Sequence, residues 1–390
     1  MARPCLRRRA SLASTARPGA PPSLPARRSY QHERQRRGHG LHDSAVARGA
    51  CARYPGPRMH LLRVAFVGCG AIAEWHWTAI QASAARTRVT ACVDPDAGRA
   101  AALAAKTGGA AFPTLAAALA ADAADAVAIM VPHHLHEAVA FEAFAAGRHV
   151  LLEKPMATDP AACARILAVA RAARTVFMLA ENAQYWPGVL RAKALLDDGA
   201  IGALRTARAW CCTPFMPQFY APDGWRFSSA AAGGGVAIDA GSHFLRPLRM
   251  WCGELREVVA VTSRVPEDLQ VETLCRALCR FDGGLVASFD ALLAVAAGAT
   301  VPRFQLTGST GEIVIDAAHV RLYGATGGAG EVVGESGYLQ SYAGEWRDFE
   351  AAVLDGTALA ASAEYALGEL RGALAMYRSA ASGRWEPVWD

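Results

Sequence analysis

Lys154 is the residue of this chain whose type and position point most directly to chemistry. Of the 40 basic side chains only three are lysines, Lys106, Lys154 and Lys193, and the other 37 are arginines. Lys154 ends the apolar run Leu151-Leu152-Glu153-Lys154-Pro155, downstream of a glycine-rich turn. A partly buried lysine can share or lose a proton beside a substrate oxygen. We therefore predict a catalytic role for Lys154, the alternative being a surface lysine that ends a strand.

Asp239 and His243 form a second group that could do chemistry. They are four positions apart, so both would lie on one face if the segment is helical. A substrate hydroxyl between Lys154 and His243 would lose its proton to one of them, while Asp239 orients His243 or binds a neighbouring hydroxyl. A buried helix histidine and a helix N-cap are the structural alternatives for these two residues.

The glycine-rich turn has the pattern of a dinucleotide site. Gly68-x-Gly70-x-x-Ala73 follows an apolar strand and opens a helix, so that backbone amides can approach a pyrophosphate. Asp94 ends the next strand, where a carboxylate accepts ribose hydroxyls and repels a 2′-phosphate. This favours NAD, although Arg99 leaves NADP open. The predicted cofactor-binding residues of this unit are Gly68, Gly70, Ala71, Ile72, Ala73 and Asp94.

Elements that position these residues follow an α/β pattern and then an α+β pattern. Apolar strands at 61–67, 89–93, 126–131, 149–152 and 175–180 alternate with alanine-rich helices, which predicts a parallel Rossmann sheet. Beyond it, successive short strands with turns such as Asp282-Gly283-Gly284 predict an α+β domain around a mostly antiparallel sheet. We predict a Rossmann domain at 59–181 and this second domain at 182–390, with its last helices packed back on the first domain.

The charge is unevenly distributed along the chain. Residues 1–58 contain 13 Arg, no Lys and two acids, a net of +11, so the rest carries −6 of the total +5. The negative net charge of the residues after 58 argues against nucleic-acid binding by that part of the chain. The arginine-rich segment is predicted to be a disordered tail, either an organellar transit peptide or the product of translation from a start upstream of Met59. Nucleic-acid binding by this tail is a third interpretation.

Composition excludes other classes of protein. No run of 18 uncharged apolar residues is present, so no membrane span is expected. The ten cysteines include no CxxC, which favours reduced thiols and a cytoplasmic location, or a plastid or mitochondrion if the tail is a transit peptide. His133, His134 and His136 lack a further ligand type at suitable spacing, so no metal is expected.

These segments, taken in order, resemble the Gfo/Idh/MocA family of oxidoreductases, which includes glucose–fructose oxidoreductase and inositol dehydrogenase. The resemblance covers about 59–390, and it implies a Rossmann domain followed by a substrate or dimerisation domain with an open-faced sheet. The segments that carry it are Gly68 to Ala73 with Asp94, Pro132 to His136, Ala146 to Pro155, Glu181 to Pro187, Gly199 to Gly202, Gly233 to Gly235 and Asp239 to His243.

The resemblance implies roles for several of these residues. Pro132, His136, Glu153 and Lys154 would lie beside the nicotinamide ribose or the substrate, and the Lys154–Pro155 bond would be cis. His243 would act as the acid/base, with Lys154 polarising the substrate oxygen. The candidate substrate residues are Asn182, Trp225, Arg226 and Arg246. An equally good interpretation is that Trp225 is a core residue and Arg226 a surface residue, without contact to substrate.

Two positions depart from the family pattern. Arg246 stands where an aspartate is often found, and Gln184 stands where many members have arginine. The predicted function is hydride transfer between NAD(P) and a hydroxyl-bearing carbon of a sugar, cyclitol or related polyol, by a homodimer or homotetramer. The alternatives are a glycosidase or epimerase of the same family that uses bound NAD transiently, and a non-catalytic NAD-binding regulator.

Overall fold

The computed structural model describes residues 61–83, 86–221, 223–294 and 302–389. The arginine-rich segment 1–58, predicted to be disordered, lies outside these residues. Among the described residues, no helix has the length and apolar character needed to cross a bilayer.

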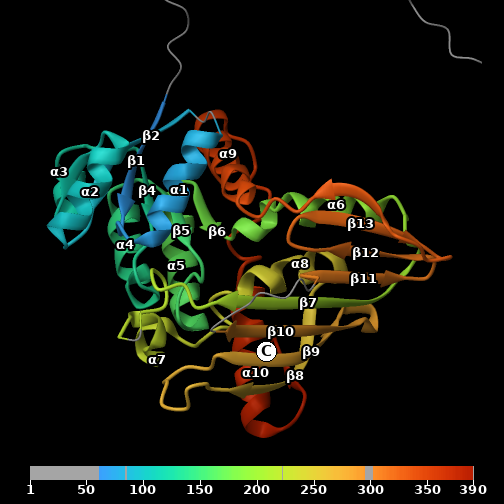
Figure 1. The fold of residues 1–390 in the computed structure, drawn as a ribbon. Helices are drawn as coiled ribbons and strands as arrows, with labels where there is room; N and C mark the ends of the chain where they lie inside the picture. Colours follow the sequence, from blue (N-terminus) through green and yellow to red (C-terminus); the bar gives the residue numbers. More distant parts are fainter. Residues whose placement is uncertain (1–60, 84–85, 222, 295–301, 390) are drawn as a thin grey trace, which may run out of the picture. The chain divides into compact units, whose positions relative to one another are not determined.

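A six-stranded parallel sheet forms the first half (Figure 1). Its order, β3-β2-β1-β4-β5-β6, is that of a Rossmann fold, as predicted. The strands are β1 (Leu62–Val67), β2 (Thr87–Val93), β3 (Ala110–Phe112), β4 (Ala126–Ile129), β5 (His149–Glu153) and β6 (Phe177–Ala180). Its helices are α1 (Ala71–Ala82), α2 (Ala97–Thr107), α3 (Leu115–Ala120), α4 (His136–Ala145) and α5 (Pro160–Ala173).

A nine-stranded sheet forms the second half, in the order β14-β13-β12-β11-β7-β10-β9-β8-β15. All its pairings are antiparallel except β7 with β10, so the predicted mostly antiparallel sheet is confirmed. The strands are β7 (Leu204–Pro214), β8 (Leu255–Ser263), β9 (Leu274–Phe281), β10 (Val286–Ala294), β11 (Phe304–Gly308), β12 (Gly311–Ile315), β13 (His319–Gly324), β14 (Glu331–Glu335) and β15 (Glu386–Pro387).

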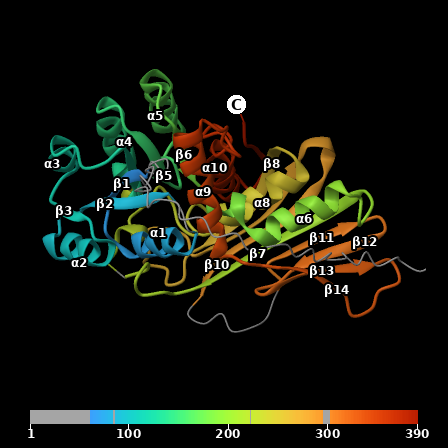
Figure 2. The same ribbon diagram turned by 90° about the horizontal axis from the view of Figure 1, so that it is seen from above.

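Helices cover one face of this second sheet (Figure 2). Along β10 the side chains alternate, and Ala287, Phe289, Ala291 and Leu293 are buried on the helix side. On the opposite face Val261 and Leu278 are 61% and 46% exposed. The helices are α6 (Pro187–Asp197), α8 (Ser242–Cys252) and α10 (Leu367–Ser382). The sheet is therefore open-faced, as the family resemblance implied.

The remaining helices border the space between the two sheets. The single-turn helix α7 (Ser229–Ala232) packs against the turn that precedes α4, and α9 (Gln340–Asp355) packs against α1 and β1. Helix α9 thus returns the chain to the first sheet after β14, before α10 and β15 complete the second half. Its contact buries Trp346 fully against Phe66 of β1, with stacked rings 5.9 Å apart.

Arg246 joins α8 to α10 rather than facing a ligand, which corrects its expected role in substrate binding. Only 2% of the residue is exposed. Its Nε and Nη2 donate to the two carboxylate oxygens of Glu369 at 2.9 and 3.0 Å, and its Nη1 donates to Gln184 at 3.0 Å. Arg249 also pairs with Glu369. Arg246 and Gln184, the two departures from the family pattern, therefore contact each other inside the protein.

Removing Glu369 should cost much of this protein's stability. The variant Glu369→Ala leaves the buried Arg246 without a carboxylate, and we expect the free energy of unfolding to fall by about 3–5 kcal/mol. The matched control is Glu364→Ala, which breaks an exposed pair with Arg171 and should cost at most about 1 kcal/mol. Urea denaturation of both variants measures the difference, and equal losses would contradict a structural role for the buried pair.

Candidate active site

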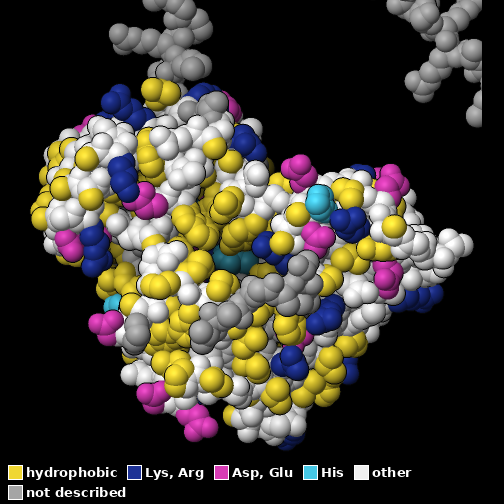
Figure 3. Space-filling view, in the orientation of Figure 1, with side chains coloured by type: hydrophobic (Ala, Val, Ile, Leu, Met, Phe, Trp, Pro, Cys, Tyr) yellow, Lys and Arg dark blue, Asp and Glu magenta, His cyan; other side chains and the backbone are white. Residues whose placement is uncertain are grey.

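A cavity of about 1160 Å³ lies between the carboxyl ends of the parallel strands and the second sheet. Figure 3 shows a hollow there, surrounded largely by hydrophobic side chains, with histidine at its bottom. Ligands of open α/β sheets bind at this edge because the loops after neighbouring strands diverge there. The cavity is lined by the loop after β1, the loop after β4 and the segment after β5.

The loop after β1 fits a dinucleotide pyrophosphate. Gly68 has φ +93°, and an added Cβ would lie 2.5 Å from the Met130 carbonyl oxygen. Gly70 is the N-cap of α1 without a side-chain capping bond, and an added Cβ would meet nothing within 4 Å. Ala71 and Ile72 line the cavity, while Ala73 is fully buried. The first amides of α1 therefore face open space, which suits a phosphate group.

Asp94 lies beside this turn and helps to fix it. Its two carboxylate oxygens accept hydrogen bonds from the amides of Cys69 and Asp96, both at 2.9 Å. Arg99, which lines the cavity, is paired with Asp96 at 3.3 Å. The carboxylate is thus positioned where the pyrophosphate turn meets the end of β2.

His136 ties the loop after β4 to the segment after β5. Its ring nitrogens lie 2.8 Å from the Pro155 carbonyl oxygen and 3.0 Å from the Val131 carbonyl oxygen. The Lys154–Pro155 peptide bond is cis, as the resemblance implied. Pro132 begins the turn that leads into α4. This set of backbone contacts holds the residues that follow β5 in place.

Glu153 is held by a chain of hydrogen bonds that sequence reasoning missed. Nε1 of Trp346 donates to Nδ1 of His76 at 3.0 Å, so Nε2 of His76 carries its proton and donates to Glu153 at 2.8 Å. The other oxygen of Glu153 accepts from the Lys154 amide at 3.0 Å. Burial alone would raise the pKa of Glu153, but His76 and Lys154 outweigh it and lower that pKa.

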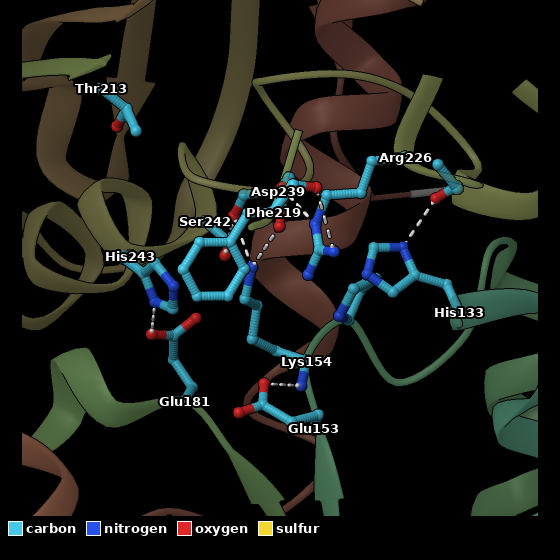
Figure 4. Close-up of polar contacts among 12 residues, drawn as sticks. His133, Glu153, Lys154, Glu181, Thr213, Phe219, Arg226, Asp239, Ser242 and His243 are labelled. Carbon is cyan, nitrogen blue, oxygen red and sulfur yellow. Dashed lines mark hydrogen bonds and ion pairs between the residues drawn. The ribbon is translucent and has the colours of Figure 1, made fainter. Parts of the chain in front are cut away.

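Lys154 forms a buried ion pair with Asp239 (Figure 4). Its Nζ donates to the carbonyl oxygen of Asp239 at 2.7 Å and to Oδ1 at 2.9 Å. The other carboxylate oxygen accepts from the Tyr220 hydroxyl at 3.0 Å and from Arg226 at 3.2 Å. Burial would raise the pKa of Asp239, but the two cations hold it far below its usual range. Asp239 therefore remains a carboxylate.

His243 takes its partner from Glu181, not from Asp239, which corrects the expected orienting role of Asp239. Helix α8 begins only at Ser242, so Asp239 and His243 do not share a helical face. Nδ1 of His243 lies 2.6 Å from the Glu181 carboxylate. Burial would raise the pKa of Glu181, but His243, Arg246 and Lys154 lower it to about 2. The anion is thus available to fix the histidine ring.

Trp225 and Arg226 both line the cavity. The guanidinium carbon of Arg226 lies 4.3 Å from the centre of the Trp225 ring and 5.5 Å from that of Phe219. Trp225 also packs edge-on against His133, with ring centres 4.5 Å apart. The short turn Trp225–Phe227 thereby brings an aromatic surface and a cation to the wall of the cavity.

Asn182 lies below the cavity instead of in its wall, which corrects its expected contact with substrate. It is 1% exposed, and its amide donates to the Ser341 hydroxyl at 2.7 Å. The residue joins the short turn Asn182–Tyr185 to the start of α9. Tyr220 contacts Asp239 through its hydroxyl, and Glu181 contacts His243, so both belong to the charged network of the site.

The described fold and cavity define a dinucleotide-binding protein with a second half built on a mostly antiparallel sheet. A model of the oxidoreductase family with an NAD-binding Rossmann fold matches residues 62–181, and one of the GFO/IDH/MocA C-terminal domain matches 189–314. The chain belongs to the Gfo/Idh/MocA family of oxidoreductases. The predicted family, fold class and nicotinamide cofactor are thereby confirmed.

Curated relatives include sugar-related and cyclitol-related enzymes. Levoglucosan dehydrogenase of Pseudarthrobacter phenanthrenivorans is 27% identical over 49% of this chain and 55% of its own length. Inositol 2-dehydrogenase of Leifsonia xyli is 36% identical over 41% of this chain and 47% of its own length. The chain thus matches about half the length of these two proteins. A dTDP-3,4-didehydro-2,6-dideoxy-alpha-D-glucose 3-reductase of Actinomadura kijaniata is 31% identical over 65% of this chain and 74% of that protein.

Solved structures share the fold. Levoglucosan dehydrogenase in complex with NADH and levoglucosan superimposes with a TM-score of 0.76 at 23% identity, covering 84% of this chain and all of that one. An NAD-binding oxidoreductase from Klebsiella pneumoniae gives a TM-score of 0.74 at 24% identity, covering 85% of this chain and all of that one. These likenesses establish the architecture.

The carboxylate of Asp239 should stabilise the protein in a pH-dependent way. Because its pKa is lowered on folding, its contribution is fully present above the unfolded pKa of about 4 and declines as the pH falls below that value. We expect Asp239→Asn to lower the free energy of unfolding at pH 7, and the difference from wild type to shrink by about 1 kcal/mol at pH 3. Urea denaturation at both pH values measures it. A difference that grows on acidification would contradict the assigned charge.

Proposed function

We propose that this protein is an NAD-dependent oxidoreductase that transfers a hydride between nicotinamide and a hydroxyl-bearing carbon of a sugar, cyclitol or related polyol. The observation that carries the proposal is the single cavity lined by the glycine turn, Lys154, Asp239 and His243. The family match and the names of the relatives support the substrate class.

His243 is proposed to remove the hydroxyl proton. Because its Nδ1 faces the Glu181 carboxylate, a neutral ring would donate from Nδ1 and leave the lone pair of Nε2 for the substrate. The Glu181 carboxylate then stabilises the imidazolium that forms. Bound NAD would supply the acceptor for the hydride, which leaves the carbon that bears this hydroxyl.

Lys154 is proposed to bind the same oxygen as a hydrogen-bond donor. An ammonium has three N–H donors, and two are directed at Asp239, so one remains for the substrate. A cation there stabilises the negative charge that develops on the oxygen as its proton leaves. Glu153, fixed by His76, orients the Lys154 backbone and thereby the side chain. Asp239, Tyr220 and Arg226 keep the lysine head from turning away.

Loss of either group should abolish most turnover. We expect Lys154→Met and His243→Asn each to lower kcat by about 10²- to 10⁴-fold, since positioned proton transfer contributes that much. The assay follows NADH absorbance over a panel of polyols, with product analysis in parallel. Matched controls are Lys193→Met and His134→Asn at exposed sites, and NADH binding by His243→Asn confirms its fold.

Two outcomes of this panel would replace the proposal. Product formed without net NADH would indicate a glycosidase or epimerase that regenerates its cofactor, and NADH binding with no product from any polyol would indicate a regulator. Wild-type kcat in the His243→Asn variant would contradict the assigned base.

We also propose a preference for NAD over NADP, because the Asp94 carboxylate would repel a 2′-phosphate. Asp94→Asn should reduce the ratio of kcat/KM for NAD to that for NADP by about tenfold, equivalent to roughly 1.4 kcal/mol. The exposed Asp198→Asn is the control and should leave the ratio unchanged. An unaltered ratio in Asp94→Asn would show that the carboxylate does not select the cofactor.

A further inference from the structure

Arg303 is a half-buried cation in the wall of the cavity, directly before β11. Its backbone is fixed on both sides: its amide donates to the Ile315 carbonyl at 2.7 Å, and its carbonyl accepts from the Trp210 amide at 2.8 Å. The side chain therefore reaches the cavity from the rigid middle of the second sheet. No step of the proposed hydride transfer uses it.

Among the residues that the structure describes, the guanidinium of Arg303 has no carboxylate partner, whereas the other cations of the cavity each have one. Lys154 and Arg226 pair with Asp239, and Arg99 pairs with Asp96. Within the described parts of the chain, Arg303 makes no side-chain hydrogen bond or ion pair, and the sequence of 295–301 contains no acidic residue.

Aromatic rings surround this cation instead. Its guanidinium carbon lies 5.3 Å from the centre of the Trp186 ring and 5.8 Å from that of Tyr338. Asp316 is the acid that acts on it through space, but Asp316 accepts from the amides of Ala318 and His319 and pairs with Arg321 at 3.6 Å. Burial lowers the pKa of Arg303. An unpaired guanidinium held against aromatic faces keeps its N–H edges free for a ligand.

The same aromatic ring links this cation to the proposed base. The Tyr338 ring lies 6.2 Å from the His243 ring and 5.8 Å from the guanidinium carbon of Arg303. Both side chains thus lie beside the same tyrosine ring, and both line the same cavity. A single small molecule can present a hydroxyl to His243 and an anionic group to Arg303.

We propose that the substrate is a polyol that carries a carboxylate, such as a sugar acid, and that Arg303 binds this carboxylate with two parallel N–H donors. This inference rests on the proposed function and narrows its substrate class. A guanidinium matches the two oxygens of a carboxylate. One unpaired positive charge balances one carboxylate, whereas a phosphate monoester carries close to two negative charges at neutral pH.

Matched substrates test the assignment in the complete protein with NAD. The panel pairs glucose with glucuronate and gluconate, and galactose with galacturonate, and adds glucose 6-phosphate and myo-inositol. We expect the acids to have the higher kcat/KM. In Arg303→Met, kcat/KM for the acids should fall about 10- to 100-fold, mainly through KM, with little change for the neutral sugars. Arg303→Lys should give an intermediate loss, because it keeps the charge but not the paired donors.

Controls separate this inference from the proposed function. Arg205→Met removes a charge from an exposed position of the same sheet and should change kcat/KM neither for the acids nor for the neutral sugars. NADH binding reports the fold of each variant. Turnover of neutral polyols without preference for acids, a preference for the phosphate, or equal losses for acids and neutral sugars in Arg303→Met would overturn the inference and leave hydride transfer standing. If no compound is turned over, binding decides: glucuronate or galacturonate must bind the wild-type NAD complex and not Arg303→Met.

Discussion

The ion pair between Lys154 and Asp239 is the interaction on which the rest of the site depends. Lys154 follows β5 of the parallel sheet, whereas Asp239 precedes α8 of the second half, so the pair joins the two halves across the cavity. The pair is largely buried with Tyr220 and Arg226 around it, both carboxylate oxygens of Asp239 accept hydrogen bonds, and Lys154 directs two of its three N–H donors at Asp239. A buried pair of this kind persists because its removal would leave an unpaired charge.

Two further carboxylates near the lysine are tolerated because each has its own partner. Glu153 is bound by His76, and Glu181 by His243. Glu345 is different: it is fully buried, and burial together with the charges of Glu153 and Glu181 raises its pKa well above its usual range, which favours the neutral form. Its oxygen lies 3.8 Å from Nδ1 of His76, but that nitrogen accepts from Trp346 and is not charged.

The fold could be predicted from the sequence because the spacing of apolar residues in strands and helices is a local property of the chain. The glycine turn could be predicted because its backbone conformation requires glycine at defined positions. Short elements such as β3 and β15 were missed since a few residues carry no period. The sequence did not predict which carboxylate each buried cation and histidine would contact. Arg246 faces Glu369 and His243 faces Glu181, across long sequence separations, and only the packing of α8 against its neighbours decides this. For His76 and Trp346, the sequence pattern indicated nothing beyond a position on the buried face of a helix.

A double-mutant cycle on the free energy of unfolding tests the central interaction most directly. It compares wild type, Lys154→Met, Asp239→Asn and the double variant at pH 7 in urea. If the two side chains form the pair that joins the two halves, the double variant should be more stable than the sum of the single losses implies, by at least about 1 kcal/mol. If the losses of the two single variants add up to the loss of the double variant within about 0.5 kcal/mol, the result would contradict the account.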